Sequence, residues 1–330
     1  MIRLLAFLAF TIGFCGPGFA AELDPASVNG AQFDGKLPAH DKLSAIAVRV
    51  QVLLDRAHFS PGEIDGKLGE NVEKALQAFT ESQGLPAGKA LTPEISSKLA
   101  ADQKPALTEY SVTERDVKGP FLEKLPAKME DMKHLKALSY TSAQEALAEK
   151  FHMSETLLAT LNPGKHMDKA GQKIIVANVL SEDAKPAQVA RIEVDKDRQT
   201  VKAFGNAGEL LNFFPATVGS EEKPTPSGTL KVTSVDRNPN YRYNPDYKFK
   251  GVKSKTAFDI KPGPNNPVGT VWIGLSSEGY GIHGTASPSR ISKSESHGCV
   301  RLTNWDVERL ARSVKKGTPV AFVTAVASKS

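Results

Sequence analysis

Between residues 41 and 100, hydrophobic side chains recur at three- and four-residue steps, which predicts amphipathic helices. The first helix would present one apolar face made of Leu43, Ile46, Ala47, Val50, Leu53 and Leu54. The second would follow the turn at Asp65-Gly66 and present Val72, Ala75, Leu76 and Phe79. A third, short helix opens at Thr92-Pro93, because proline fits the first position of a helix. We therefore expect a small all-α bundle, whose core would be marginal in isolation.

The next stretch divides into a polar segment and a second, smaller module. Residues 101–136 are rich in Lys, Glu and Pro and show no period, so we expect an interdomain linker. Residues 137–180 follow the order strand, helix, helix, strand, which is typical of a small α+β module. The expected elements are a strand at 137–140, helices at 143–150 and 154–161, and a strand at 174–176.

From residue 188 to 326, apolar and polar residues alternate in runs separated by Gly and Pro, which predicts β-strands. The runs cover 189–194, 199–204, 210–218, 228–235, 270–275, 280–283 and 318–324. One helix is expected at 304–316, with a capping-box-like start at Thr303-x-x-Asp306 and Gly317 after its end. The long span 236–268 is expected to form a lid or substrate wall. The chain is therefore expected to be multidomain, with a mainly β sandwich and one docked helix at this end.

The first twenty residues differ from everything that follows. Arg3 gives a positive start, Leu4 to Phe14 is an apolar run, and Gly18-Phe19-Ala20 ends in small residues. This order is typical of a secretory signal peptide, and the apolar run is too short for a permanent membrane anchor. We therefore expect an exported protein of the periplasm or cell wall. Residues 21–40 show no clear period and are expected to be a loose N-terminal segment.

Composition and charge narrow the classes of protein further. Of 330 residues, 40% are hydrophobic and 24% are charged, as in ordinary soluble globular proteins. Lys and Arg total 42 against 37 Asp and Glu, and the resulting net charge of +5 is spread along the chain. A nucleic-acid partner is not favoured, because such proteins concentrate their basic residues. Mild basicity fits work near an anionic polymer.

The candidate chemistry lies around a single cysteine. Cys15 belongs to the expected signal peptide, so Cys299 would be the only cysteine of the exported chain. His283 precedes it by sixteen positions and His297 by two. A thiolate is a nucleophile, and a neighbouring imidazole can accept the thiol proton. Gly298 lets the backbone approach a substrate closely.

Two further features complete this hypothesis. The amides of Gly298 and Cys299 are candidate donors to a developing oxyanion. Zinc is the alternative, with His283, His297 and Cys299 as ligands. However, no HExxH or CxxC spacing lies nearby, and a zinc-bound thiolate would be a poor free nucleophile. The pattern therefore favours a cysteine nucleophile without a metal or another cofactor. Trp272 and Trp305 are expected to be core or helix-docking residues.

These motifs resemble the YkuD-type catalytic domain of L,D-transpeptidases, whose mark is a His followed at a distance by Ser/Thr-His-Gly-Cys. The matching segments are Thr217-Val218-Gly219-Ser220, Thr225-Pro226-Ser227-Gly228-Thr229, Ile282-His283-Gly284-Thr285 and Ser296-His297-Gly298-Cys299. The resemblance covers residues 188–325. Arg301 stands where some members have Asn, and Gly284 where some have Ser. A backbone carbonyl would therefore have to orient His283.

The two front modules also resemble known modules. Residues 41–100 resemble a peptidoglycan-binding-like module through Ile64-Asp65-Gly66, Ala75-Leu76-x-x-Phe79 and Gln83-Gly84-Leu85. Residues 137–180 resemble a LysM module, which binds glycans, through Ala146-Leu147-Ala148-x-x-Phe151, Leu161-Asn162-Pro163 and Gly171-Gln172-Lys173-Ile174. A helical spacer and a connecting αα-hairpin remain the alternatives to these two interpretations.

The resemblance implies an acyl transfer on peptidoglycan stem peptides. Cys299 would attack the bond between diaminopimelate and D-Ala, with His283 as base and then acid. Gly298 and Cys299 amides, with His297, would hold the oxyanion. An acceptor diaminopimelate amine would give a 3→3 crosslink, water would make the enzyme an L,D-carboxypeptidase, and the same chemistry could attach an outer-membrane protein to the wall.

The remaining expectations concern substrate binding and the competing classes. Ser296 and Arg301 are implied in binding, Arg301 through a stem-peptide carboxylate, with a surface ion pair as its alternative. A catalytically silent wall-binding protein is the competing class, and the intact pair of His283 and Cys299 argues against it. A peptidase of ordinary L,L substrates is a third class, against which the two front modules argue.

Overall fold

The computed structural model describes residues 23–33, 38–86, 88, 91–180, 186–219, 225–247, 252–294, 296 and 298–324. The expected signal peptide lies outside these residues. Within them, no helix has the length and apolar character that crossing a membrane requires.

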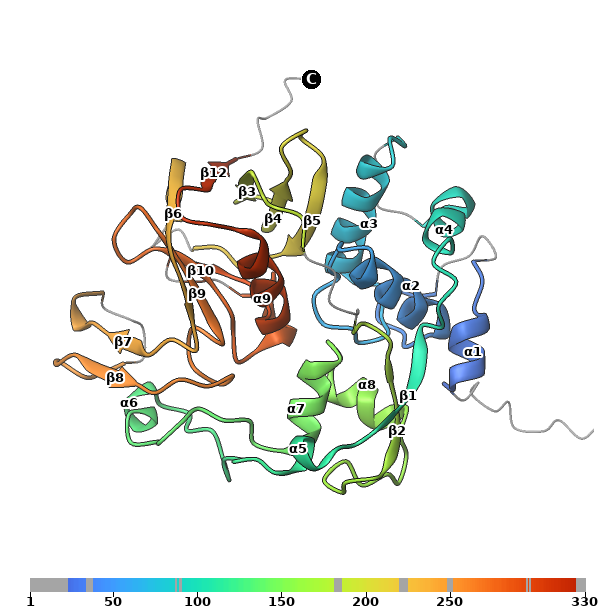
Figure 1. Cartoon of the computed structure of the whole chain (residues 1–330), viewed down its shortest axis with the longest axis horizontal. Coiled ribbons are helices and arrows are strands. Elements are labelled where there is room, and N and C mark those ends of the chain that lie inside the picture. The colour runs from blue at the N-terminus through green and yellow to red at the C-terminus, as the bar shows by residue number, and fades with distance from the viewer. Residues whose placement is uncertain are drawn as a thin grey trace, which may run out of the picture.

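One eight-stranded sheet forms the larger domain, with the strand order β11-β10-β9-β6-β12-β3-β4-β5 (Figure 1). Its strands are β3 (Arg191–Asp195), β4 (Thr200–Phe204), β5 (Leu210–Pro215), β6 (Gly228–Arg237), β9 (Val271–Leu275), β10 (Gly281–His283), β11 (Val300–Arg301) and β12 (Pro319–Val323). Each of the seven expected runs overlaps one of these strands, and β11 lies outside all of them. The pairs β10–β11 and β12–β3 are parallel, and all other neighbours are antiparallel.

The two halves of this sheet are joined rather than separate. β6 pairs with β12 along its first residues and with β9 along its last, with a register shift between Val232 and Ser234. Such an irregularity bends a strand, so the halves face each other across one core. Ile192 and Ile273, from opposite halves, lie in the same buried cluster. The expected sandwich is thus a single folded sheet.

Helix α9 (Asn304–Ser313) packs on this core through Val307 and Leu310. Its start differs from the expected capping box. Thr303 Oγ1 accepts from the Asp306 N–H at 3.2 Å, but the Asp306 carboxylate accepts from Ser60 instead of returning to the cap. The helix also ends at Ser313, earlier than expected, because Val314 is extended.

The span expected to form a lid contains two short paired strands, β7 (Tyr241–Tyr243) and β8 (Phe258–Ile260), with the 3₁₀ turn η1 (Pro245–Tyr247) between them. Tyr243 is buried and stacks on Phe258 at 4.7 Å between ring centroids. This packing gives the lid a small core.

The three expected front helices are present as α2 (Ala45–Arg56), α3 (Glu70–Ser82) and α4 (Pro93–Leu99). The expectation of a loose segment at 21–40 is wrong for part of its length. Helix α1 (Pro25–Gly30) forms there, capped by Asp24, and buries Val28 completely. Asn29 exchanges two hydrogen bonds with the backbone of Leu107, which holds α1 in place.

The second module has the expected helices α7 (Ala143–Lys150) and α8 (Glu155–Thr160) and the expected final strand β2 (Lys173–Ala177). Its first strand, however, is β1 (Leu107–Ser111), inside the expected linker, and pairs with β2 in antiparallel register. The stretch 101–136 also contains the short helices α5 (Glu114–Val117) and α6 (Met129–Met132). The expectations of a linker and of a strand at 137–140 are therefore wrong.

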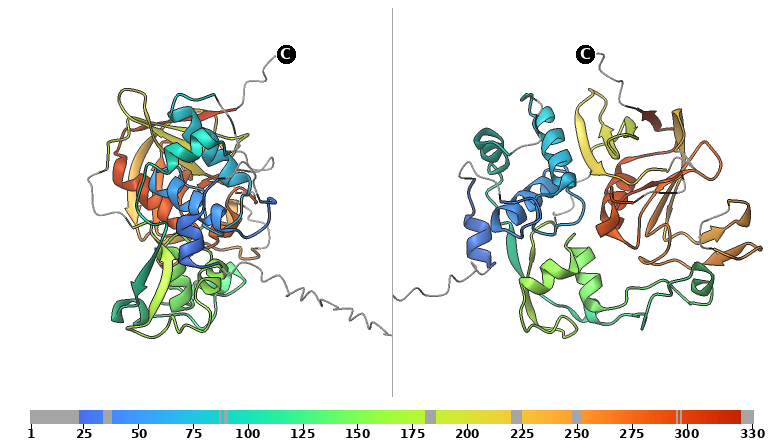
Figure 2. Two further views of the ribbon diagram at one scale, coloured as in Figure 1. Left: turned by 90° about the vertical axis from the view of Figure 1, so that its right-hand side faces the viewer. Right: turned by 180° about the vertical axis from the view of Figure 1, so that it is seen from behind.

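Residues 118–142 form an arm that runs from this module to the lid, where α6 lies beside β7 and β8 (Figures 1 and 2). Glu130 accepts a hydrogen bond from the Lys253 N–H at 2.6 Å. The Leu138 N–H donates to Pro262 at 2.9 Å, and the Leu138 carbonyl accepts from Asn265 at 2.9 Å. Residues 137–140 make contacts to the lid base, which explains why they form no strand with β2.

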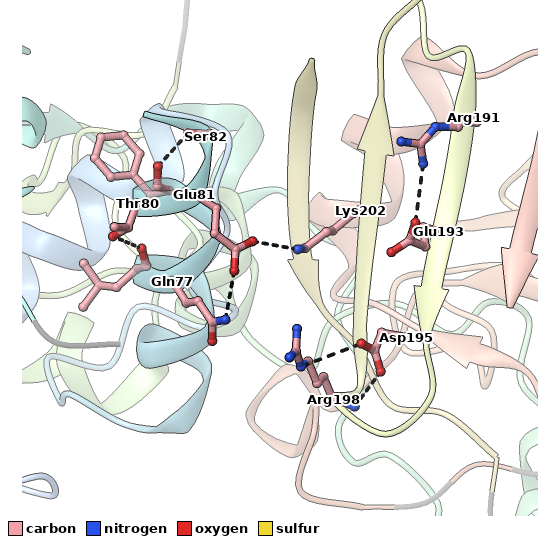
Figure 3. Close-up of polar contacts among 11 residues, drawn as sticks. Gln77, Thr80, Glu81, Ser82, Arg191, Glu193, Asp195, Arg198 and Lys202 are labelled. Carbon is pink, nitrogen blue, oxygen red and sulfur yellow. Dashed lines mark hydrogen bonds and ion pairs between the residues drawn. The ribbon is translucent and has the colours of Figure 1, made fainter. Parts of the chain in front are cut away.

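The front modules and the catalytic sheet share their cores. One buried cluster combines Val52 of α2 with Leu107 of β1 and Leu147 of α7, and another combines α2 and α3 with Phe213 of β5. Phe59 forms a bridge with Phe213, which extends the β5 edge of the sheet. Lys202 of β4 pairs with Glu81 of α3 at 3.0 Å (Figure 3). The parts thus pack as one body.

Candidate active site

The parallel register of β10 and β11 brings the predicted nucleophile and base to one face of the sheet. Ile282 pairs with Val300 and His283 with Arg301, so Cys299 lies opposite Gly281. Because side chains alternate along strands, Cys299, His283 and Arg301 share a face. Ile282 and Val300 point the other way, into the core. The alternation thus leaves the reactive residues over the sheet and the apolar ones beneath it.

His283 is buried, and one backbone carbonyl holds its ring. Its Nδ1 lies 2.7 Å from the Gly284 carbonyl oxygen, which can only accept, so Nδ1 carries the proton. Nε2 is then the basic nitrogen. Burial lowers the pKa of His283 to about 3, and the charge of Arg301 acts in the same direction. The imidazole is therefore neutral at neutral pH, with its lone pair on Nε2. The expectation that a carbonyl orients it is confirmed.

Cys299 lies just before β11, partly exposed, and its thiol donates to the Gly279 carbonyl at 3.5 Å. Burial raises the pKa of the thiol above its usual range, although the Gly281 N–H and the charge of Arg301 act against this. The resting site thus holds a neutral thiol and a neutral imidazole. Attack requires the thiol proton to leave Gly279 and pass to Nε2 of His283.

A hydroxyl clamps the loop that carries the cysteine. Ser296 Oγ donates to the Cys299 carbonyl and accepts from the Gly298 N–H at 3.2 Å. Gly298 has φ of 102°, which favours glycine at this position. The Gly298 N–H is thus engaged inside the loop and does not point at a substrate. Of the two amides predicted as oxyanion donors, that of Gly298 is therefore already engaged, and the role of the Cys299 amide stays a prediction. His297 lies outside the described residues.

Trp272 belongs to the site, contrary to the expectation that it is a core residue. It pairs with His283 across β9 and β10, is half-buried and stacks on the imidazole at 5.5 Å with an interplanar angle of 18°. A Cβ at Gly281 would lie 2.6 Å from Trp272 Cζ2, so the missing side chain lets the indole lie flat. Strand alternation was the available signal, since Val271 and Ile273 fill the core.

Arg301 lies beside the pair and has a basic and an aromatic neighbour. Burial lowers its pKa, while Cys299 and Tyr241 act to raise it and Arg290 to lower it. Tyr241 comes from β7, so a residue of the 236–268 span acts electrostatically on Arg301. A guanidinium can bind a carboxylate in bidentate fashion.

The described residues contain no group of three or more His, Cys, Asp and Glu side chains with the spacing of a metal site. His283 Nδ1 is engaged by a carbonyl. What the arrangement can perform is nucleophilic acyl transfer: a thiol, a neutral base of defined tautomer, an amide donor and a cation meet at one edge of a sheet.

Comparisons with known proteins agree with this class. Residues 189–321 match the family model YkuD, described as the L,D-transpeptidase catalytic domain. The Bacillus licheniformis protein named L,D-transpeptidase YkuD is 32% identical over 180 residues, which cover 54% of this chain and 92% of that protein. Its namesake in Bacillus subtilis is 29% identical over 54% of this chain and 91% of that protein. The Escherichia coli protein named L,D-transpeptidase YbiS is 28% identical over 56% and 60%.

The mainly β domain, with His283 and Cys299 brought together at neighbouring strand ends, thus agrees with the class that the family model describes. The chain belongs to the YkuD family of L,D-transpeptidases.

Proposed function

We propose that this protein forms 3→3 crosslinks in peptidoglycan through a thioester on Cys299. The observation that supports this most is the shared face of Cys299 and His283, with the His283 Nδ1–H fixed by Gly284. This arrangement leaves Nε2 as the proton acceptor beside the only cysteine of the described chain. Family membership supplies the substrate class, the stem peptides of peptidoglycan.

In the first half-reaction, Sγ attacks the carbonyl carbon between diaminopimelate and D-Ala while Nε2 of His283 takes the thiol proton. The Cys299 N–H donates to the oxyanion. The tetrahedral intermediate collapses, its C–N bond breaks, and the imidazolium returns the proton to the leaving amine of D-Ala. A thioester on Cys299 remains.

In the second half-reaction, the side-chain amine of an acceptor diaminopimelate attacks the thioester. Nε2 takes a proton from this amine, the C–S bond breaks, and the imidazolium gives the proton to the leaving thiolate. The product is an amide between two diaminopimelate residues. A neutral imidazole is needed at both stages, and the depressed pKa of His283 keeps it neutral.

Substrate binding follows from the groups around the pair. Arg301 would bind a stem-peptide carboxylate, while Trp272 and Tyr241 would form walls beside the reacting bond. The helical and LysM-like modules would bind the glycan strands and hold the enzyme on the wall. We propose an exported protein that acts in the periplasm or cell wall, and attachment of an outer-membrane protein remains an alternative use of the same thioester.

The test is a mass-spectrometric product assay with disaccharide-tetrapeptide. We expect the wild-type protein to yield a crosslinked dimer that lacks one D-Ala, and Cys299→Ala to yield none. His283→Gln should slow turnover about 10²- to 10⁴-fold, the usual contribution of a general base. Tripeptide as the sole product would indicate an L,D-carboxypeptidase. No Cys299-dependent product, with binding to sacculi retained, would contradict the proposal and favour a wall-binding protein.

A further inference from the structure

The carbonyl that orients His283 belongs to a residue held on several sides. The Gly284 N–H donates to Val271 at 3.2 Å, and its carbonyl accepts from His283 at 2.7 Å. Its Cα lies against Asn304 and Gly269: a Cβ there would collide with Asn304 Oδ1 and lie 3.3 Å from Gly269 Cα. Asn304 thus packs directly against the residue whose carbonyl orients the base.

Asn304, the first residue of α9, is buried and hydrogen-bonded through both ends of its carboxamide. Oδ1 accepts from the Thr270 N–H at 3.2 Å. Nδ2 donates to the Pro264 carbonyl at 3.2 Å and to the Glu149 carboxyl at 3.0 and 3.3 Å. A carboxamide can rotate by 180°, and only its partners decide which atom faces Gly284.

Glu149 supplies the partner that comes from outside the catalytic domain. It lies on α7 of the LysM-like module, and only 9% of it is exposed. Its other hydrogen bond among the described residues comes from the Tyr140 hydroxyl at 3.3 Å. Burial raises its pKa to about 8, and Glu145 and Glu308 add to this, while the bonds from Asn304 and Tyr140 oppose it. Burying a carboxyl group in this way costs free energy, so we asked what Glu149 does at this position.

We propose that Glu149 is a positioning residue for the catalytic base, acting from the front module through Asn304 and the Gly284 carbonyl on His283. It accepts from Nδ2 and thereby fixes Oδ1 towards the Thr270 N–H and Gly284. With the carboxamide reversed, Nδ2 would face the Thr270 N–H donor and Oδ1 the Pro264 carbonyl, so the bonds that hold Asn304 packed against Gly284 would be lost. The inference rests on the proposed role of His283.

This arrangement gives the front module a function beyond attachment to the wall. The catalytic domain would hold His283 in the tautomer with the proton on Nδ1 only when α7 is docked on α9. A module that served as a tether alone would have no need to place a carboxyl against Asn304. The prediction is that the module affects the chemical step itself.

The experiment compares Glu149→Leu with Glu149→Gln and with the control Glu145→Leu in the full chain. Glu145 is a matched control because it also joins α7 to the catalytic domain, by accepting from Asn265 at 2.8 Å, yet does not touch Asn304. We expect Glu149→Leu to lower kcat for the tetrapeptide about tenfold with KM within twofold, since small misplacement of a base is costly. Glu149→Gln keeps an acceptor oxygen and should restore most of the rate.

A second readout separates this inference from the proposed function. In ¹⁵N-labelled protein, the wild-type His283 should show one tautomer with the proton on Nδ1, and Glu149→Leu should show a mixture. This signal is measured even if the wild type has no turnover, which would contradict the proposed function alone. If Glu149→Leu does not fold, Asn304→Asp tests the same link, because it replaces the donating Nδ2 by an oxygen of equal size.

Two results would overturn the inference. One is an unchanged His283 tautomer in the folded Glu149 or Asn304 variant. The other is a loss of kcat in Glu149→Leu no larger than in Glu145→Leu, or equal in the Leu and Gln variants, which would reduce Glu149 to a contact between modules.

Discussion

Two groups of buried polar residues show opposite electrostatics. At the junction of the modules, the fully buried Asp55 of α2 binds Arg309 of α9 at 2.8 Å and His152 at 3.0 Å. Burial alone would raise the pKa of Asp55, but Arg309 and His152 outweigh it and hold the pKa well below its usual range. In the active site, burial dominates, so the pKa of His283 falls and that of Cys299 rises.

The two groups differ in the partners of their buried side chains and not in how deeply those side chains are buried. Asp55 has Arg309 and His152 as partners on two other modules, and His152 also stacks on Trp305 at 5.1 Å. Asp55 therefore stays ionised, and its contacts join α2 to Arg309 of α9 and to His152 of the second module.

Cys299 and His283 have backbone carbonyls as polar partners in place of an opposite charge, so burial decides their charge state. Burial favours the neutral thiol and the neutral imidazole, although the Gly284 carbonyl acts in the other direction on His283. Buried charges with a partner thus join the modules, and burial without such a partner keeps Cys299 and His283 uncharged.

The largest expected effect is on the reactivity of the Cys299 thiol, which tests whether the active-site pair is uncharged. Because the pKa of Cys299 is raised and that of His283 is depressed, no thiolate–imidazolium pair forms between pH 5 and 8. The thiolate fraction should then rise about tenfold per pH unit, or about 1,000-fold across this range. Alkylation by iodoacetamide, followed by mass spectrometry at Cys299, measures it. A plateau in the rate below pH 8 would mean that the pair is ionic and the contrast wrong.

The second-largest effect concerns the buried ion pair of Asp55 and Arg309 at the junction of the modules. Asp55→Ala should lower the free energy of unfolding by about 3–5 kcal/mol, because it leaves the buried Arg309 without its main anion. Denaturant unfolding of the variant measures this loss. Asp168→Ala is the control, since that carboxylate is 82% exposed. Equal losses in the two variants would show that the junction contributes no more than a surface contact.

The contrast also explains what could be predicted from the sequence. The catalytic strands were predictable because alternation is a local signal, and Cys299 and His283 because their residue types and spacing point to one chemistry. β1 was missed because Leu107–Ser111 lies in a stretch rich in Lys and Pro and is stabilised by β2, far along the chain. The charges of the junction were not predictable for the same reason: Asp55 and Arg309 are brought together only by module docking.

Within the site, the missed features are those that depend on a neighbour's shape. Trp272 faces His283 because Gly281 leaves room for its ring. The Gly298 amide turns away because the Ser296 hydroxyl reaches it. Strand alternation could have placed Trp272 on the face of His283, but the room left by Gly281 and the bond from the Gly298 amide to Ser296 follow no period or motif. The sequence therefore predicted the reacting atoms better than their surroundings.

A smaller effect tests the tight packing that supports the base. Gly284→Ala should lower the free energy of unfolding by about 1–3 kcal/mol, because its Cβ would collide with the buried Asn304 Oδ1. Thermal unfolding measures the loss, and kcat should fall as the carbonyl moves away from His283. Gly30→Ala is the control, since no atom lies within 4 Å of the position of its Cβ. A fully stable and active Gly284→Ala variant would contradict the close contact.

The smallest effect comes from a second ion pair between the same parts of the chain. Lys202 binds Glu81 at 3.0 Å, like Asp55 and Arg309 across modules, but its side chains are 22% and 32% exposed (Figure 3). Solvent screens such a pair, so a double-mutant cycle with Lys202→Met and Glu81→Gln should give a coupling of about 0–1 kcal/mol.

That coupling should shrink further as salt is added, whereas the loss in Asp55→Ala should stay nearly constant, because a fully buried pair is screened far less. Unfolding at low and high ionic strength measures both. The Lys202–Glu81 pair could instead couple as strongly as Asp55–Arg309 and resist salt. In that case, solvent exposure would not explain the difference between the two ion pairs, and charge alone would have to explain how they join the modules.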